Sequence, residues 1–305
     1  MAAPYPAQHD PAPVDLVPAA VVATWPVGTF LENIAALPGG DFVISVHSER
    51  QLLRCTSGGE HRPLATLPVP TMGLVVDGER VFVVAGEPGR APGWLFEVGL
   101  DGDVQERLTL PDNVFLNGFT PGHAGRAYTV DSVRGELIAV DLHAFTARVV
   151  LADERLAKCS AEPMVPGANG IKADDTSLWI TNTDRATVLR ADLDGDGSVG
   201  PLTVVAEHLR GDDLALDVEG SAYITTHIEN ALVRLRPDGE RCVLAGPEQG
   251  MAGCTSCAFG TAPDERTSLF VLTTGGVVQP YRGVPQPAKL VRLEVGVRGR
   301  TVGFL

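Results

Sequence analysis

The sequence Gly167-Ala168-Asn169-Gly170-Ile171-Lys172 begins a unit that recurs along the chain. Its Asn-Gly step opens a short apolar run, and an acidic turn follows at Asp174-Asp175. The run Leu178-Trp179-Ile180-Thr181 predicts a second β-strand, and Val188-Leu189-Arg190 predicts a third. The unit is therefore a small group of strands joined by tight turns.

The predicted second strand gives the period of the repeat. Its six occurrences begin at residues 42, 81, 127, 178, 222 and 269, which are separated by 39, 46, 51, 44 and 47 residues. These intervals suit a four-stranded propeller blade. We therefore predict an all-β fold, a six-bladed β-propeller of four-stranded antiparallel blades around a central channel. The strand expected at residues 19–24 precedes the first blade and should complete the last one, which closes the ring.

One position near the start of each unit faces the predicted channel at a common height. In the first five units it lies nine or ten residues before the second strand. The six residues are Glu32, Met72, Asn117, Asn169, Asp212 and Thr255.

Four of these ring positions carry oxygen donors, namely Glu32, Asn117, Asn169 and Asp212. A closed ring of hard oxygens with two negative charges predicts a site for Ca²⁺ or another divalent cation, with water completing the coordination. Asn-Gly and Asp-Asp are also ordinary turn chemistry, which explains each position singly. Turn chemistry does not explain donors in register across blades, and Glu32 is not a turn former.

Composition and charge restrict the partners. The 305 residues are 44% hydrophobic and 20% charged, which suits one large globular domain, and the net charge is −14. Nucleic acids and anionic membranes need a basic face, so we expect neither as a partner. No apolar run reaches the length of a membrane span. We expect a small-molecule substrate and either a monomer or a weak homo-oligomer.

The five cysteines are an odd number spread over a long chain, which favours a reducing, cytoplasmic location. Cys254 and Cys257 form a lone C-x-x-C that lacks a second ligand pair, so we interpret both as packing residues. Residues 1–17 are expected to form a flexible N-terminal tail without the features of a secretory signal, and residues 18–305 a single propeller domain. Residues 301–305 are a candidate edge strand.

Two further motifs need an interpretation. The stretch Asp192-Leu193-Asp194-Gly195-Asp196-Gly197 resembles the start of an EF-hand loop, but its twelfth position is Thr203 and its flanks are strand-like, so we predict a hairpin turn. His47 and His227 each end a second strand, which allows both to point to the channel mouth. A structural role is common for such histidines, and proton transfer is the alternative.

The pattern resembles the family of senescence marker protein, gluconolactonase and related lactonases, which are six-bladed propellers. The resemblance covers residues 32–293 and is strongest at 168–172 with 179–184, and at 212–217 with 226–230. It implies that Glu32, Asn169 and Asp212 bind the metal and that Asn117 contacts metal or substrate. The family has an arginine just before that Asn, where this chain has Phe115.

We therefore expect a Ca²⁺-dependent hydrolase of a lactone or related ester. The metal would polarise the carbonyl and activate water, and Asp212, His47 or His227 would act as the base. Asn117, Met72, Phe115 and Thr255 are the candidate substrate-binding residues, and Met72 and Phe115 favour a hydrophobic substrate. Two alternatives remain: a biosynthetic cyclase or isomerase that uses the same pocket on a hydrophobic intermediate, and a non-catalytic binding propeller.

Overall fold

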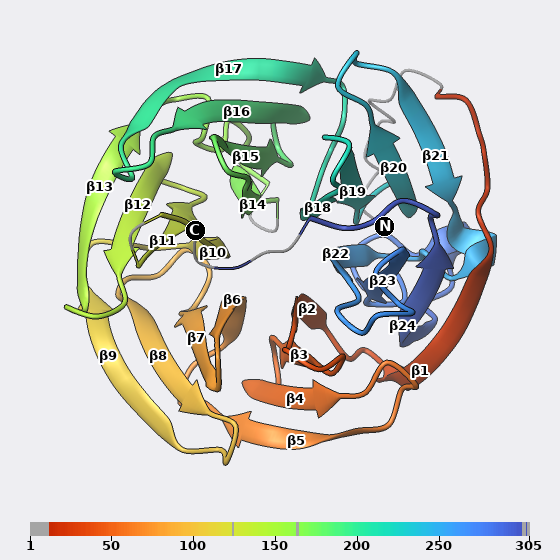
Figure 1. The fold of residues 1–305 in the computed structure, drawn as a ribbon, viewed down its shortest axis with the longest axis horizontal. Coiled ribbons are helices and arrows are strands. Elements are labelled where there is room, and N and C mark those ends of the chain that lie inside the picture. Colours follow the sequence, from red (N-terminus) through yellow and green to blue (C-terminus); the bar gives the residue numbers. More distant parts are fainter. Residues whose placement is uncertain (1–11, 124, 163–164, 301–302, 304–305) are drawn as a thin grey trace.

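Six four-stranded antiparallel sheets stand in a ring in the computed structural model (Figure 1). The structure describes residues 12–123, 125–162, 165–300 and 303. The predicted six-bladed propeller is confirmed, and each predicted second strand lies second from the centre of its blade.

The strands run outward from the centre in chain order. Blade one contains β2 (Leu31–Ala36), β3 (Phe42–Val46), β4 (Gln51–Cys55) and β5 (His61–Thr66). Blade two contains β6 (Thr71–Asp77), β7 (Arg80–Ala85), β8 (Gly93–Gly99) and β9 (Val104–Leu110). Blade three contains β10 (Leu116–Pro121), β11 (Arg126–Asp131), β12 (Glu136–Asp141) and β13 (Thr146–Ala152). Blade four contains β14 (Ala168–Ala173), β15 (Ser177–Asn182), β16 (Thr187–Leu193) and β17 (Val199–Glu207). Blade five contains β18 (Leu214–Leu216), β19 (Ala222–Thr226), β20 (Ala231–Leu235) and β21 (Arg241–Ala245). Blade six contains β22 (Cys254–Phe259), β23 (Ser268–Thr273), β24 (Pro287–Glu294) and, on its outer edge, β1 (Ala19–Val27).

The ring closes through its N-terminal strand, as predicted. β1 pairs antiparallel with β24, from Ala19 opposite Leu293 to Val27 opposite Pro287, so the first strand of the chain completes the last blade. With this pairing blade six has four strands, like every other blade, and the ring has no open edge at its closure.

The described part of the N-terminal segment contacts blade five. The amide of Asp15 donates to the carbonyl of Val243 (3.0 Å), and the amide of Val17 donates to that of Leu244 (2.9 Å). Residues 12–17 of the predicted tail are therefore hydrogen-bonded along β21, while residues 1–11 lie outside the described residues. Of the candidate edge strand, only Gly303 is described.

The hydrophobic core lies between the blades. Six clusters of buried residues each combine side chains of two adjacent blades, for example Leu137 of blade three with Leu178 of blade four. Because each blade packs on both faces, the inner strands β3, β15 and β19 are buried along their whole length. This explains their continuous apolar runs, and it leaves the polar residues of the innermost strands free to face the axis.

The acidic stretch at residues 192–197 and the C-x-x-C pair both have structural roles. The acidic stretch forms the turn of the β16–β17 hairpin, in which the amide of Gly197 donates to the carbonyl of Asp194 (2.8 Å). Cys254 and Cys257 are buried in the cluster between blades five and six. The only helices within the described ranges are the short 3-10 turns η1 (Pro247–Gln249) and η2 (Tyr281–Gly283), and neither could span a membrane.

Candidate metal centre and active site

The predicted ring positions coincide with irregularities of the innermost strands. Register shifts mark β-bulges in five of these strands, and the ring residues Glu32, Met72, Asn117, Asn169 and Thr255 lie within them. The sixth, Asp212, lies just before β18 and donates its amide to the carbonyl of Thr225 (2.7 Å). A bulge re-aims one side chain relative to its strand, so five of the six ring positions are built by the same device, and Asp212 is placed by the backbone just before its strand.

Glycine follows the ring residue in three blades, where the innermost strands approach closely. A Cβ on Gly118 would lie 2.5 Å from the carbonyl oxygen of Asn169, and one on Gly170 would lie 2.5 Å from the Cα of Asp213. The Asn-Gly steps therefore do more than turn the chain. They allow blades three, four and five to bring their ring side chains together.

Asn169, Asp212 and His227 form a continuous hydrogen-bonded chain. The amide nitrogen of Asn169 donates to Oδ1 of Asp212 (3.0 Å), and Oδ2 of Asp212 lies 3.2 Å from Nδ1 of His227. The other imidazole nitrogen, Nε2, lies 3.2 Å from the hydroxyl oxygen of Thr274. The three residues are at least nine-tenths buried, so Asp212 holds His227 in one orientation from inside the protein.

Glu32 belongs to the same electrostatic cluster. Burial of its carboxyl, followed by the charges of Asp212 and Asp213, raises the pKa of Glu32 well above its ordinary range. Burial also raises the pKa of Asp212, an effect that the hydrogen bond and charge of His227 oppose. Neither Glu32 nor Asp212 has a lysine or arginine partner within the described residues. The cluster therefore has an excess of negative charge that a cation would relieve.

The other predicted residues occupy different surroundings. Asn117 is buried and lies 3.4 Å from the hydroxyl of Ser132. Met72 is buried in the cluster between blades two and three, and Phe115 packs against that cluster. The hydroxyl of Thr255 donates to the carbonyl of Leu31 (2.7 Å), which joins blade six to blade one. Its side chain is thus used in a contact between blades.

His47 and His227 lie on either side of one aromatic residue that the sequence did not single out. The ring of Phe30 lies 5.6 Å, centroid to centroid, from each imidazole. Nδ1 of His47 is 3.1 Å from the carbonyl oxygen of Thr71, and burial lowers the pKa of His47. Both histidines therefore pack against Phe30 from equivalent places, directly after β3 and β19.

A second polar layer, also missed from the sequence, lies one step further along the innermost strands. Nζ of Lys172 lies 2.7 and 2.9 Å from the two carboxylate oxygens of Asp213. Asp213 also accepts hydrogen bonds from Asn33 of blade one (3.1 Å) and Ser256 of blade six (2.5 Å). Asn33, Asp213 and Ser256 each directly follow a ring residue, and this shared position in the sequence was the available signal. We call these four residues the axial plug.

The ring residues fit a divalent cation by charge and donor type. With the carboxyls of Glu32, Asp212 and Asp213 ionised and Lys172 protonated, the ring and the plug together carry a net charge of −2. The ring offers two carboxylates and two amides, which are hard oxygen donors. Among the described residues, no three His, Cys, Asp or Glu side chains are arranged to hold a metal by themselves. The amides are thus needed to complete the set.

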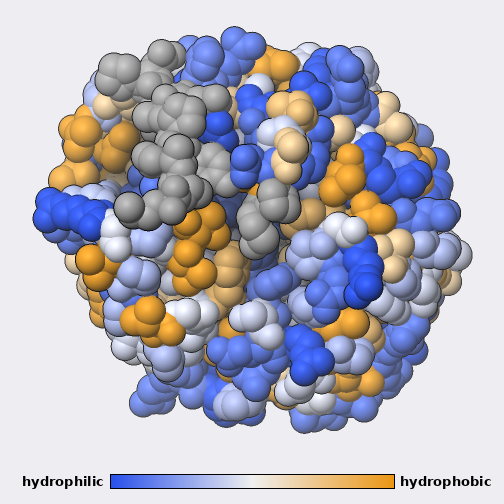
Figure 2. Space-filling view, turned by 180° about the vertical axis from the view of Figure 1, so that it is seen from behind, coloured by the Kyte–Doolittle hydropathy of each residue, from blue (hydrophilic) through white to orange (hydrophobic). Residues whose placement is uncertain are grey.

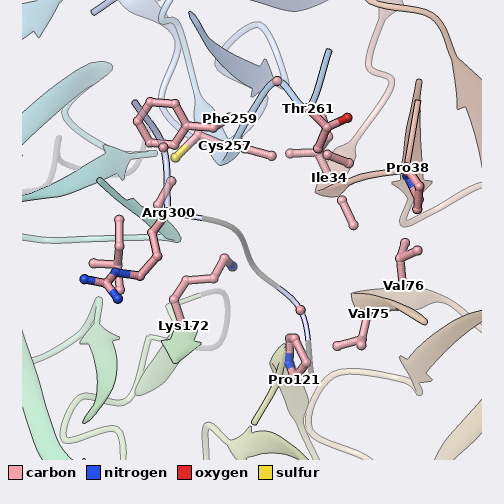
Figure 3. A pocket seen from close by; sticks show the side chains of 18 of the residues that line it. Ile34, Pro38, Val75, Val76, Pro121, Lys172, Cys257, Phe259, Thr261 and Arg300 are labelled. Atoms are coloured by element: carbon pink, nitrogen blue, oxygen red, sulfur yellow. The ribbon is translucent and has the colours of Figure 1, made fainter. Parts of the chain in front are cut away.

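A large cavity lies at the opposite end of the axis from the ring. It has a volume of about 580 Å³ and is lined by the final residues of the innermost strands, including Val75, Val76 and Phe259. Lys172 of the axial plug also lines it (Figure 3). The ring lies where these strands begin, so the plug separates it from this distal cavity.

The outer surface gives little sign of a large apolar interface on one face. In the view of Figure 2, the hydrophobic side chains outside the grey atoms lie in small separate groups among polar ones. Single exposed hydrophobic residues are normal on a soluble protein.

Comparison with known proteins supports the fold. No family model matches the chain, and no curated protein matches it. A structure of regucalcin from Agrobacterium tumefaciens, named as a calcium-binding protein, has a TM-score of 0.74 at 18% identity and covers 96% of this chain and 99% of its own. A luciferin-regenerating enzyme has a TM-score of 0.72 at 13% identity, covering 92% and 96%. A protein assigned as a gluconolactonase has a TM-score of 0.69 at 14% identity, covering 94% and 96%.

The chain shares the fold of these propellers. The resemblance inferred from the sequence is therefore confirmed at the level of the fold, and similarity extends over nearly the whole of each chain. At these identities the likeness carries no residue roles, so the function rests on the site itself.

Proposed function

We propose that the protein is a Ca²⁺-dependent hydrolase of a lactone or related ester. The observation that carries the proposal is the pair of carboxyls of Glu32 and Asp212, which lie at equivalent positions near the start of β2 and β18 and have no basic partner among the described residues. Asn169 is bonded to Asp212 beside them. The naming of the regucalcin neighbour as a calcium-binding protein supports the choice of metal.

The ion would be held by Glu32, Asn169 and Asp212, with Asn117 as a fourth donor. When bound, Ca²⁺ supplies positive charge that polarises the substrate carbonyl and makes water a better nucleophile. Asn169 holds Oδ1 of Asp212 by its amide hydrogen, so the two side chains are already mutually oriented (3.0 Å). Because these side chains are already ordered, less conformational entropy is lost when the ion binds.

The proton-transfer group that the geometry favours is His227. Oδ2 of Asp212 accepts from Nδ1 of His227 (3.2 Å). This leaves Nε2 as the atom that would take a proton from water and return it to the leaving oxygen. The hydroxyl of Thr274 lies beside Nε2 and can orient it (3.2 Å). His47, across the ring of Phe30, provides a second basic nitrogen at the same end of the axis.

Apolar side chains at this end favour a hydrophobic substrate. Phe30 packs against both histidines, and Phe115 lies just before the bulge that carries Asn117. We expect these rings to exclude water around the apolar part of an ester and to leave its carbonyl beside the oxygen donors.

The test is hydrolysis of a panel of lactones and phenyl esters by calcium-loaded protein and by chelator-treated protein. Asp212→Asn should lower kcat by at least about 10², the effect of a lost base and its orienting group, while the blade cores keep the protein folded. The exposed Asp238→Asn provides a matched control and should retain full activity.

Other outcomes identify the alternatives. Turnover of a linear precursor alone, without incorporation of oxygen from labelled water, would establish a cyclase or isomerase. If the wild type and Asp212→Asn are both inert on every substrate and bind a protein partner equally, the protein is a binding propeller.

We further propose a cytoplasmic protein that is a monomer or a weak homo-oligomer and acts on a small molecule rather than on nucleic acid or a membrane. All five cysteines are free, which supports a reducing compartment. The net charge of −14 disfavours both anionic partners.

A further inference from the structure

The distal cavity differs in charge from the rest of the molecule. The protein has 24 basic and 38 acidic residues. Four basic residues line this cavity, namely Lys172, Arg266, Arg298 and Arg300, against a single acid, Asp77. Because Asp77 forms an ion pair with Arg80, it adds little negative charge to the space. The cavity is thus a local positive site in an acidic protein.

Two of its cations are available for a ligand. Lys172 is bonded to Asp213, and Arg300 pairs with Asp175 (2.8 Å). Arg266 and Arg298 are exposed, and neither guanidinium has an ion-pair partner within the described ranges. An arginine presents a planar fork of donors that matches a carboxylate.

The walls of the distal cavity divide into a charged and an apolar side. Figure 3 shows Lys172 and Arg300 on one side of the space, with Ile34, Val75 and Val76 on the other. The volume of about 580 Å³ lies in the range of small-molecule sites. An uncharged apolar ligand would leave the guanidinium groups unused, and an inorganic anion would leave the apolar wall exposed to water.

The backbone around the cavity holds its shape. The segment 297–300 leaves blade six and lies against blade five, where the amide of Arg300 donates to the carbonyl of Leu216 (2.8 Å) and that of Val218 donates to Arg298 (3.0 Å) (Figure 1). Arg298 and Arg300 are therefore placed by hydrogen bonds between two blades rather than by a free loop.

We propose that the distal cavity is a second ligand site, which binds a small organic carboxylate with an apolar chain. The carboxylate lies against Arg266 and Arg298, and the chain lies against Ile34, Val75 and Val76. The axial plug separates this site from the ring, so binding requires neither Ca²⁺ nor the ring residues.

Titration calorimetry with octanoate, in the presence of chelator, tests the proposal. We expect saturable binding of one molecule for each protein chain. Octanamide has the same chain without the charge and should bind at least tenfold more weakly. Inorganic phosphate carries charge without the chain and should also bind at least tenfold more weakly. These comparisons use the wild-type protein and do not depend on any variant.

Variants locate the site. The double variant Arg266→Gln/Arg298→Gln should weaken octanoate binding at least tenfold. Arg90→Gln is the matched control, because Arg90 is an exposed arginine in the β7–β8 loop, at the ring end of the axis, and should have no effect. Asp212→Asn should also bind octanoate normally, which separates this site from the proposed catalytic centre.

Three results would overturn the proposal. They are the absence of saturable octanoate binding, equal binding of octanoate and octanamide, and unchanged binding by the double arginine variant. Equal affinity for phosphate and octanoate would exclude a role for the apolar wall and would also overturn it.

Discussion

Replacement of Lys172 by methionine tests the role of the axial plug. Lys172 and Asp213 form a bidentate contact at 2.7 and 2.9 Å, and their side chains are 9% and 3% exposed. Met keeps most of the volume of Lys but leaves the carboxylate of Asp213 without a positive partner, close to the charges of Glu32 and Asp212. Breaking a buried pair in this way costs about 3–5 kcal/mol of unfolding free energy.

The expected change in melting temperature follows from the size of the protein. For 305 residues, an unfolding entropy of about 2.1 cal/mol/K per residue gives about 0.64 kcal/mol/K for the chain. Lys172→Met should therefore lower Tm by about 5–8 °C. The assay is scanning calorimetry at pH 7 with chelator, combined with urea unfolding to obtain the free energy.

A double variant separates the charge from the packing. Asp213→Asn keeps one acceptor oxygen, which can serve both Asn33 and Ser256 as one carboxylate oxygen does now, so Lys172→Met/Asp213→Asn should recover most of the loss. Lys289→Met is the control, since Lys289 contacts the amide oxygen of Gln286 rather than a carboxylate, and it should cost less than about 1 kcal/mol. A loss below about 1 kcal/mol in Lys172→Met, or additive effects in the double variant, would refute the argument.

Two further predictions concern the metal and the pH dependence of stability. Calcium at a hundredfold excess over its Kd should add about 2.7 kcal/mol to the free energy of unfolding and raise Tm by about 4 °C in differential scanning fluorimetry. Glu32→Gln should abolish this rise in Tm. An unchanged rise in the variant would show that Glu32 does not bind the ion. Burial raises the pKa of Glu229 from an ordinary value of 4.5 to about 7, against the opposing charge of Arg210. The stability that Glu229 contributes is thus fully present below about pH 4.5 and is lost as the pH rises through 7, so Glu229→Gln should raise Tm at pH 8, and the exposed Glu240→Gln should not.

The sequence was sufficient for the fold because each blade repeats the same physical requirement. Every second strand is buried on both faces between two interblade clusters, and this produces the apolar runs at regular intervals, such as Phe42–Val46. The ring residues were found by their constant distance from those runs. Their bulges were not predicted, because an Asn-Gly or Asp-Asp step has the same composition in a simple turn.

Contacts across the axis could not be predicted in the same way. Lys172 and Asp213 are 41 residues apart and meet only because blades four and five are packed at a particular distance, which Gly170 permits. The contact of His227 with Asp212 lies within one blade, yet it depends on the side-chain rotamers of both. Thr255 occupies a ring position by sequence, but its hydroxyl donates to the carbonyl of Leu31.

The axial plug explains how opposite charges can occupy the two ends of one axis. Without Lys172, three carboxylates would face one another at the ring end and their field would extend to the distal cavity. The ammonium group balances Asp213, so the carboxyls of Glu32 and Asp212 are the acidic groups left for the proposed cation to balance. Because the Lys172–Asp213 pair lies between the ends, the carboxyls of Glu32 and Asp212 are separated from Arg266 and Arg298. Loss of Lys172 alone should therefore weaken anion binding at the distal cavity as well as the fold, because it leaves Asp213 as an unbalanced negative charge beside that cavity.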